Sequence, residues 1–261
     1  MKGATHILLT LLTLAAVLAP FAPDYMEHIE TIPFLIVTFL AVFFGSITPD
    51  IDAGRGSAIF HSHIPGAKGK RFILTPVFGY GLCYTCYYPV RKIFHLIFGD
   101  KIYAKAGHRE LPHSPLGCLC ISALLTLYIW LIFAALSFIP PMSFLFNHPL
   151  IYGFGIAFFA GCLLHLIEDS CDNSGVHWFY PFSFTRLRGT LRGDGTDIKP
   201  RVYAVIMLCV AAGIITASFT GLIPENSRII AAIFIPGLLW IIFLRLSGCP
   251  AKKVLRDNYR S

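Results

Sequence analysis

Long apolar stretches separated by short polar stretches dominate the chain. A membrane core about 30 Å thick needs about 20 consecutive apolar residues to be crossed by a helix. Six stretches approach or exceed that length: Met1–Ala22, Ile32–Thr48, Ser114–Ile139, Leu150–Ser170, Val202–Ile223 and Ile229–Leu246. The pattern therefore predicts an all-α, polytopic membrane protein with about six transmembrane helices.

Two apolar stretches leave alternatives open. The first, Met1–Ala22, has Lys2, an apolar centre and small residues, as a signal peptide has. A histidine at its start, His6, favours a retained first helix, because a discarded leader has no use for that side chain. The segment 72–98 is rich in aromatic residues and interrupted by Pro76 and Pro89. We expect it to be a re-entrant hairpin or to lie in the membrane interface.

Composition supports a membrane protein. The 261 residues are 56% hydrophobic and 13% charged, whereas soluble domains are about 25% charged. The net charge of +7 does not indicate nucleic-acid binding, because the basic residues are spread over several loops. We expect one membrane domain over 1–246 and a basic cytoplasmic tail over 247–261. The eight cysteines do not form a disulfide pattern, and Cys83 and Cys86 make a lone, weak CxxC signal.

Loop charges predict the orientation of the helices. Loop 22–31 has three acidic residues and no basic one, and loop 140–149 has no charge. The basic residues lie in the alternate loops: Arg55, Lys68, Lys70, Arg71, Arg91, Lys92, Lys101, Lys105, Arg109, Arg186, Arg188, Arg192, Lys199, Arg201 and those of the tail. Since basic loops stay in the cytoplasm, we expect an inner-membrane protein with both termini cytoplasmic. Segment 72–98 then cannot cross an odd number of times.

The polar end of the stretch Leu150–Ser170 is the most informative feature of the sequence. His165, Glu168, Asp169 and Asp172 follow one another at i, i+3, i+4 and i+7, which on a helix places them on one face. Ionisable groups at the end of a membrane helix are costly to bury and mark functional sites. This stripe predicts a site at the inner membrane face.

Other segments bring similar groups to the same membrane level. His6 opens the first helix, Asp50 and Asp52 follow the second, and His108 and His113 precede the third. After Pro49 we expect an extended Asp50-Ile-Asp52 segment whose two carboxylates point the same way. His and carboxylate ligands suit Zn²⁺, and also Mn²⁺ or Fe²⁺. The candidate ligands of one or two ions are His6, Asp50, Asp52, His108, His113, His165 and Asp169.

A metal site of this kind indicates hydrolysis. A bound divalent ion lowers the pKa of water, and two ions clamp both oxygens of a phosphoester displacement. Asp169 or Asp50 would orient the water, and Arg109 would grip a phosphate together with the helix that begins at Ser114. Glu168 is either catalytic or a hydrogen-bond partner of a ligand. His61 and His63 are either further ligands or solvated side chains.

The chain resembles the YdjM-like, LexA-regulated membrane-bound metal-dependent hydrolases. The matching motifs, in order, are Thr5-His6, Thr48-Pro49-Asp50-Ile51-Asp52, the run from Gly107 to Ser114, His165-Leu-Ile-Glu-Asp169, Gly175-Val176 and Tyr180-Pro181-Phe182. The resemblance implies a multi-metal phosphoesterase distantly like zinc-dependent phospholipase C and P1-type nucleases. This sequence departs from the family pattern at three places. Ala53 replaces a histidine, Glu110-Leu111-Pro112 replaces a Gly-x-Thr, and a Thr-Pro after Asp169 is lacking.

Three functions are compatible with these residues. The first is a membrane-embedded metal-dependent hydrolase, with zinc as the expected metal and a lipid or other phosphoester as the substrate, because the site lies at headgroup depth. The second is a metal-ion transporter or sensor, since acidic and histidine residues in membrane helices also mark ion pathways. The third is a structural site whose metal only joins the helices.

Overall fold

The computed structural model describes residues 3–56, 58–60, 74–99, 111–193 and 195–250. Its first helices are α1 (Gly3–Leu18), η1 (Ala19–Phe21), α2 (Ala22–Glu27), η2 (Ile29–Thr31), α3 (Ile32–Ile47), η3 (Pro49–Gly56), η4 (Ala58–Phe60), α4 (Leu74–Leu82), η5 (Cys83–Tyr87) and α5 (Tyr88–Phe98). They are followed by α7 (Pro115–Ser137), η6 (Pro140–Leu145), α8 (His148–Ser170), α9 (Lys199–Phe219), η7 (Glu225–Ser227) and α10 (Arg228–Leu246). The described residues therefore form an all-helical protein, as the sequence predicts.

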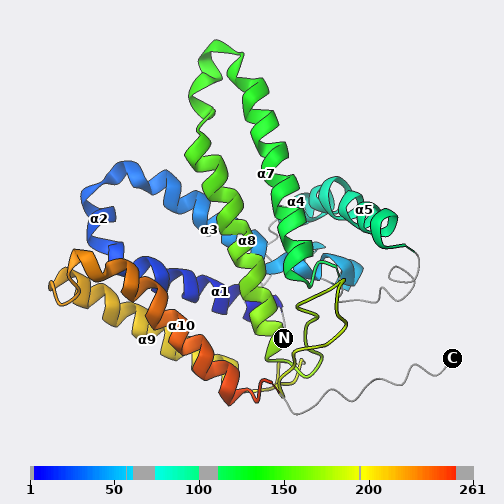
Figure 1. Cartoon of the computed structure of the whole chain (residues 1–261). Helices are drawn as coiled ribbons and strands as arrows, with labels where there is room; N and C mark the ends of the chain where they lie inside the picture. Colours follow the sequence, from blue (N-terminus) through cyan, green and yellow to red (C-terminus); the bar gives the residue numbers. More distant parts are fainter. Residues whose placement is uncertain (1–2, 57, 61–73, 100–110, 194, 251–261) are drawn as a thin grey trace, which may run out of the picture.

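The prediction of six membrane-spanning helices is confirmed. Six helical stretches are long and apolar enough to cross a membrane: Gly3–Glu27, Ile29–Ala53, Pro115–Ser137, His148–Ser170, Lys199–Phe219 and Glu225–Leu246. In Figure 1 the hairpin of α7 and α8 projects upward, while α1, α9 and α10 run together toward the left. α3 packs along α8, and α1 packs against both α3 and α9. The two arms thus meet around the start of α1 and the ends of α3 and α8.

Close contact between α3 and α8 depends on two glycines. A Cβ atom on Gly161 would lie 2.5 Å from the carbonyl oxygen of Val42, and one on Gly45 would collide with the carbonyl oxygen of Phe158. Small residues at such positions let membrane helices approach backbone to backbone. The contact fixes the end of α3 beside the last three turns of α8, where the polar stripe lies.

The segment 72–98 contains one continuous helical run rather than a hairpin. α4, η5 and α5 follow one another without a reversal from Leu74 to Phe98, and in Figure 1 the run lies crosswise to α7. Pro89 lacks an N–H group and its ring would clash with the carbonyl four residues earlier. The π turn Cys83–Tyr87 widens the helix just before Pro89 and relieves that clash. The arrangement excludes a re-entrant path over the described part of this segment and favours the interfacial alternative.

The prediction of an extended segment after Pro49 is wrong. Residues Pro49–Gly56 form the 3-10 helix η3, and Thr48 before it is already helical, with φ −66° and ψ −39°. Proline is well tolerated in the first turn of a helix, where its missing N–H group is not needed. Successive residues of a 3-10 helix turn by about 120°. Asp50 and Asp52 therefore point in different directions instead of sharing one face.

The start of α7 agrees with the sequence. Ser114 has the extended backbone of an N-cap, and its hydroxyl accepts a hydrogen bond from the Gly117 N–H at 3.0 Å. The same hydroxyl donates to the carbonyl oxygen of Leu111 at 2.8 Å. Because this cap uses the only donor of the hydroxyl, Ser114 ties the preceding residue, His113, to the start of α7.

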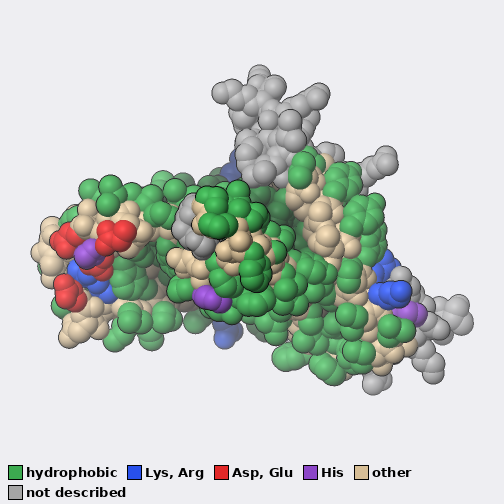
Figure 2. All heavy atoms as spheres, turned by 90° about the horizontal axis from the view of Figure 1, so that it is seen from above, with side chains coloured by type: hydrophobic (Ala, Val, Ile, Leu, Met, Phe, Trp, Pro, Cys, Tyr) green, Lys and Arg blue, Asp and Glu red, His purple; other side chains and the backbone are tan. Residues whose placement is uncertain are grey.

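Two of the connections at the span ends opposite the polar stripe lie side by side. Arg228, at the start of α10, forms an ion pair with Asp24 of α2. Figure 2 shows charged side chains gathered at this left end, while most of the visible surface is hydrophobic. The two loops at this end therefore lie on the same side, as the alternating topology requires.

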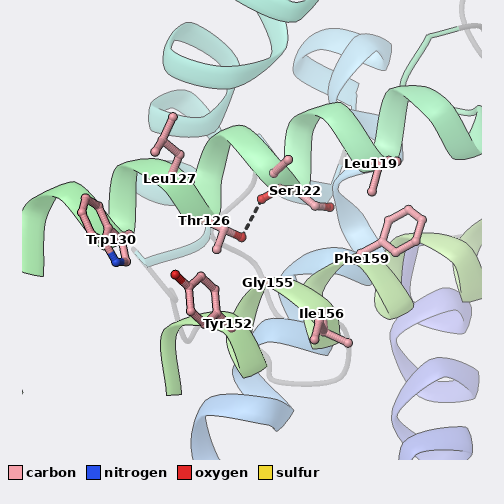
Figure 3. A pocket seen from close by; sticks show the side chains of 10 residues that line it. Leu119, Ser122, Thr126, Leu127, Trp130, Tyr152, Gly155, Ile156 and Phe159 are labelled. Atoms are coloured by element: carbon pink, nitrogen blue, oxygen red, sulfur yellow. Dashed lines mark hydrogen bonds between the residues drawn. The ribbon is translucent and has the colours of Figure 1, made fainter. Parts of the chain in front are cut away.

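A groove between α7 and α8 faces outward along the projecting hairpin (Figure 3). Its volume is about 720 Å³ and it has no charged side chain among its lining residues. They are Leu119, Ser122, Ala123, Thr126, Leu127, Trp130, Tyr152, Gly155, Ile156 and Phe159. Its composition suits contact with apolar lipid tails, and the candidate chemistry lies elsewhere.

Candidate metal centre

Four separate segments contribute side chains to one buried cluster. His6 comes from the first turn of α1, Asp50 from η3, His113 from the residue before the α7 cap, and His165 and Asp169 from the end of α8. His6, His113, His165 and Asp169 are almost completely buried, while the Asp50 side chain is 19% exposed. These five residues are called the central cluster below.

Distances within the central cluster fit a metal ion better than direct hydrogen bonds. His113 Nε2 lies 3.4 Å from Asp50 Oδ1 and 3.5 Å from Asp169 Oδ2. His165 Nε2 lies 3.7 Å and 3.6 Å from the same two atoms, and His6 Nε2 lies 3.4 Å from Asp169 Oδ1. Hydrogen bonds are normally about 2.7–3.2 Å long. Ligands about 2.0–2.1 Å from a tetrahedral zinc ion are about 3.3–3.4 Å apart.

Two overlapping sets of three residues could hold an ion. One consists of His6, His165 and Asp169, and the other of Asp50, His113 and His165; within each set the ligand atoms lie within 4.8 Å of one another. His165 Nε2 is buried and has no hydrogen-bond partner among the described residues. His165 belongs to both sets, and its one free nitrogen can bind only one ion. The two oxygens of Asp169 face different histidines, Oδ1 toward His6 and Oδ2 toward His113 and His165.

The other ring nitrogen of two of the imidazoles is fixed by a hydrogen bond. His165 Nδ1 lies 2.7 Å from the carbonyl oxygen of Ser46, so this nitrogen is the donor and Nε2 is the ring nitrogen that faces the cluster. His6 Nδ1 lies 2.6 Å from Glu168 Oε2, and the Thr10 hydroxyl donates to the other Glu168 oxygen at 2.9 Å. Such outer partners orient metal-binding histidines and set their tautomer.

His113 has a carboxylate near each ring nitrogen. Asp52 Oδ2 lies 3.8 Å from its Nδ1, on the opposite side of the ring from Asp50. The different directions of the two aspartates in η3 thus place one at the cluster and one behind His113. Glu168 likewise lies behind His6 and not at the cluster. The sequence left open whether Glu168 is catalytic or a hydrogen-bond partner of a ligand, and the geometry favours the hydrogen-bond partner.

Asp172 departs from the polar stripe. α8 ends at Ser170, and Asp172 lies beyond it, with its carboxylate accepting a hydrogen bond from the Ser174 N–H at 3.4 Å. The residue also pairs with Leu191 across an isolated β-bridge. Asp172 therefore holds the loop after α8 instead of extending the helical stripe. His108, Arg109, His61 and His63 lie outside the described residues.

Tyr87 and His177 lie outside the spans, near the centre or the loop beside it, and both have strongly shifted pKa values. Burial, with a smaller contribution from Asp52, raises the pKa of Tyr87 to about 12. Burial and the neighbouring Arg186 guanidinium lower the pKa of His177 to about 4, and Arg186 Nε donates to His177 Nε2 at 2.7 Å. The phenol of Tyr87 and the imidazole of His177 are therefore both neutral at pH 7.

Sequence reasoning missed Thr10 and Ser46, which support two of the histidines. Thr10 lies four residues after His6, a spacing that places both on one helix face, and this signal could have identified it. Ser46 contributes only its carbonyl oxygen, which any residue offers, so its amino-acid type gave no signal.

Comparison with known proteins identifies the family. The sequence profile described as YdjM inner membrane protein matches residues 1–248. No curated protein and no solved structure is significantly similar to the chain. The profile covers the central cluster, all six candidate spans and the short segments between them, and the chain therefore belongs to the YdjM inner membrane protein family.

Proposed function

We propose that this protein is a membrane-embedded, metal-dependent hydrolase of a phosphoester, and that a membrane lipid is its natural substrate. The observation that carries the proposal is the convergence of three imidazoles and two carboxylates from four segments, at separations suited to zinc ligands. Zinc is the expected ion, with manganese or iron as alternatives of similar ligand preference. Zinc bound there would supply a hydroxide nucleophile near neutral pH.

The protein residues divide into two roles. His6, His113, His165, Asp50 and Asp169 would hold the ion, and Asp52 and Glu168 orient the imidazoles from behind. Asp50 is the most exposed member of the central cluster, so we infer that water reaches the ion from its side. Asp169 or Asp50 would accept the proton of the attacking water. We propose that His108 is a further ligand of the ion and that Arg109 binds the substrate phosphate.

We further propose that the centre faces the cytoplasm. The basic loops lie at the same ends of the spans as the central cluster, and such loops are retained in the cytoplasm. Residues 1–246 would then form one membrane domain with both termini inside the cell, and 247–261 a basic tail. This places the centre at the level of the inner-leaflet headgroups, where a lipid phosphoester is accessible.

Burial of the central cluster favours one alternative, a metal that only joins helices. Four of its five residues are nearly inaccessible, as in closed structural zinc sites, whereas catalytic sites keep an open position for water. The exposed edge at Asp50 is the feature that favours catalysis over this alternative. The two functions differ in whether metal-loaded protein turns over any ester.

Metal content is the first test. We would measure zinc, manganese and iron in detergent-purified protein, comparing the unaltered chain with His165→Ala and with His148→Ala as a control. His148 lies on the same helix, is exposed and is remote from the cluster. We expect at least one equivalent of metal in the unaltered chain and in the control, and loss in His165→Ala. An unaltered chain that holds no metal after reconstitution would refute both metal-dependent functions.

Turnover is the second test. Metal-loaded protein would be screened against phosphomonoesters and phosphodiesters, with lipid and soluble examples of each, beside Asp169→Ala. Hydrolysis that is lost in Asp169→Ala while its helical circular dichroism is kept would support the hydrolase. Bound metal without hydrolysis of any ester would favour the helix-joining role.

A further inference from the structure

A second concave site adjoins the central cluster on the side of Asp52. It is a cleft of about 280 Å³ between η3 and the run formed by α4, η5 and α5. Asp52, Tyr80, Tyr84, Tyr87, Tyr88 and Arg91 are its polar lining residues. This tyrosine-arginine cleft contains two charged side chains, Asp52 and Arg91, whereas the lining of the groove between α7 and α8 contains none.

The tyrosines form a continuous stripe along one helix. Tyr80, Tyr84 and Tyr88 follow at intervals of four residues, and such residues lie above one another on a helix. The rings of Tyr84 and Tyr88 are 5.6 Å apart, and the ring of Tyr80 lies 5.0 Å from Phe60 on the facing wall. Arg91 comes three residues after Tyr88 and so ends the stripe with a positive charge.

The position of the cleft links it to the chemistry of the centre. Asp52 lines the cleft and also lies 3.8 Å from Nδ1 of His113, a member of the central cluster. A molecule in the cleft would therefore lie against Asp52, on the side of His113 that faces away from Asp50. A π turn supplies several of the lining residues, and π turns inside α-helices often occur at functional sites.

The side chains indicate the kind of ligand. Arginine binds phosphate through two parallel N–H groups, which gives both strength and orientation. Tyrosine offers an apolar ring and a hydroxyl that donates a hydrogen bond, which suits a group that is part polar and part apolar. Tyrosine is also favoured at headgroup level in membranes. Together these features match a phosphate-bearing headgroup.

We propose that the tyrosine-arginine cleft binds the phosphate-bearing part of the substrate, with Arg91 holding the phosphate and the tyrosines packing against the adjoining group. The inference rests on the proposed hydrolase function, which it extends by naming the residues that select an anionic phosphoester. The phosphate could belong to a lipid headgroup or to a soluble phosphoester, and separate titrations with one ligand of each kind distinguish these two sources.

Binding, not turnover, is the test, so that it does not depend on catalysis. Full-length protein in detergent would be titrated with short-chain phosphatidic acid and, in a separate arm, with glycerol 3-phosphate. Each titration would be done on chelator-treated and on zinc-loaded protein. The variants are Arg91→Gln and, as its matched control, Lys92→Gln, which removes the same charge from the adjacent exposed residue outside the cleft.

We expect Arg91→Gln to weaken phosphatidic acid binding at least about tenfold, since charged hydrogen bonds are lost. Lys92→Gln should stay within about twofold, because an exposed charge contributes little. Tyr84→Ala should also weaken binding, whereas Tyr152→Ala, which alters the other groove, should not. Tyr84 is 68% exposed, so its replacement does not endanger folding. Equal effects of Arg91→Gln and Lys92→Gln would overturn the proposal and leave only a membrane-anchoring role.

The two arms identify the source of the phosphate. Arg91-dependent binding of phosphatidic acid but not of glycerol 3-phosphate assigns a lipid, and equal binding of both assigns a soluble phosphoester. Arg91-dependent binding in a protein that hydrolyses none of the esters would support the binding role of the cleft and refute the hydrolase function. If the protein hydrolyses an ester and the KM is unchanged in Arg91→Gln, the hydrolase function is supported and the binding role of the cleft is refuted.

Discussion

His165 Nδ1 lies 2.7 Å from the carbonyl oxygen of Ser46. A carbonyl accepts hydrogen bonds only, so the imidazole must carry a proton on Nδ1, which leaves Nε2, the nitrogen that faces Asp50 and Asp169, to bind an ion. The backbone of α3 thereby sets the tautomer of a side chain on α8. The chemistry of the centre consequently depends on how closely these two helices pack.

That dependence predicts the effect of enlarging Gly161. In Gly161→Ala the new Cβ would lie 2.5 Å from the carbonyl oxygen of Val42, so the helices must separate. We expect a loss of about 1–3 kcal/mol of stability, the usual cost of overpacking, together with reduced metal content. Thermal unfolding in detergent and metal analysis measure both effects.

Gly213→Ala is the matched control for this substitution. A Cβ on Gly213 meets nothing within 4 Å, and the residue lies inside another spanning helix, α9. We expect its stability to equal or exceed that of the unaltered chain, because alanine favours helix more than glycine does. Unchanged metal content in Gly161→Ala would show that α3 and α8 need not touch for the centre to form.

A second prediction concerns Glu168, which accepts hydrogen bonds from His6 Nδ1 and from Thr10. Glu168→Gln keeps the size of the side chain but removes the charge that favours the Nδ1-protonated form of His6. We expect metal affinity to fall about 10–100-fold, as is usual for outer partners of metal-binding histidines. Competition with a zinc-binding dye gives the affinity.

Thr10→Val serves as the control for Glu168→Gln. It removes one hydrogen bond to the same carboxylate and leaves the contact with His6, so we expect a smaller loss of affinity. A Glu168→Gln protein that binds metal as tightly as the unaltered chain would show that His6 does not rely on this carboxylate, or does not bind the ion.

The local features of the centre could be predicted from the sequence, and the long-range ones could not. The i, i+4 spacing of His165 and Asp169 and the cap at Ser114 depend on nearby residues, and both are as expected. The path of Asp50 and Asp52 was predicted wrongly, because Pro49 is compatible with an extended chain and with the start of a helix. The contact between His6 and Glu168 joins residues 162 positions apart, which no local pattern reveals. The i, i+4 spacing of the cleft tyrosines is visible in the sequence, but their approach to η3 and Phe60, which forms the cleft, is not.

A third prediction follows from the low pKa of His177, to about 4. The unfolded chain binds this proton at about pH 6.5, so between these two values the unfolded state holds more protons than the folded state. Stability therefore rises with pH across this window and is lost as pH falls from about 6.5 to about 4. We expect the thermal midpoint to fall less steeply over this range in His177→Gln. The groups of the metal centre titrate in both proteins, so their contribution cancels when the pH profile of His177→Gln is subtracted from that of the unaltered chain.

Arg186→Gln tests the cause of that shift. Removing the adjacent positive charge should raise the pKa of His177 toward its ordinary value. The pH range between the pKa values of the folded and unfolded states then becomes narrower, so the loss of stability in acid should be smaller. Identical pH profiles for the unaltered chain and His177→Gln would mean that this imidazole stays solvated, in conflict with its buried position.

The last prediction concerns the orientation of the spans. The ion pair between Asp24 and Arg228 joins the loop after the first span to the loop before the last span, so both loops lie on one side of the membrane. The scarcity of unpaired basic residues there predicts that this side is outside the cytoplasm. Alkaline phosphatase fused after Gly221 should be active, since it needs export, whereas green fluorescent protein fused after Ser261 should fluoresce. The reverse pattern at both positions would place the metal centre outside the cytoplasm, and the substrate would then have to come from the outer leaflet.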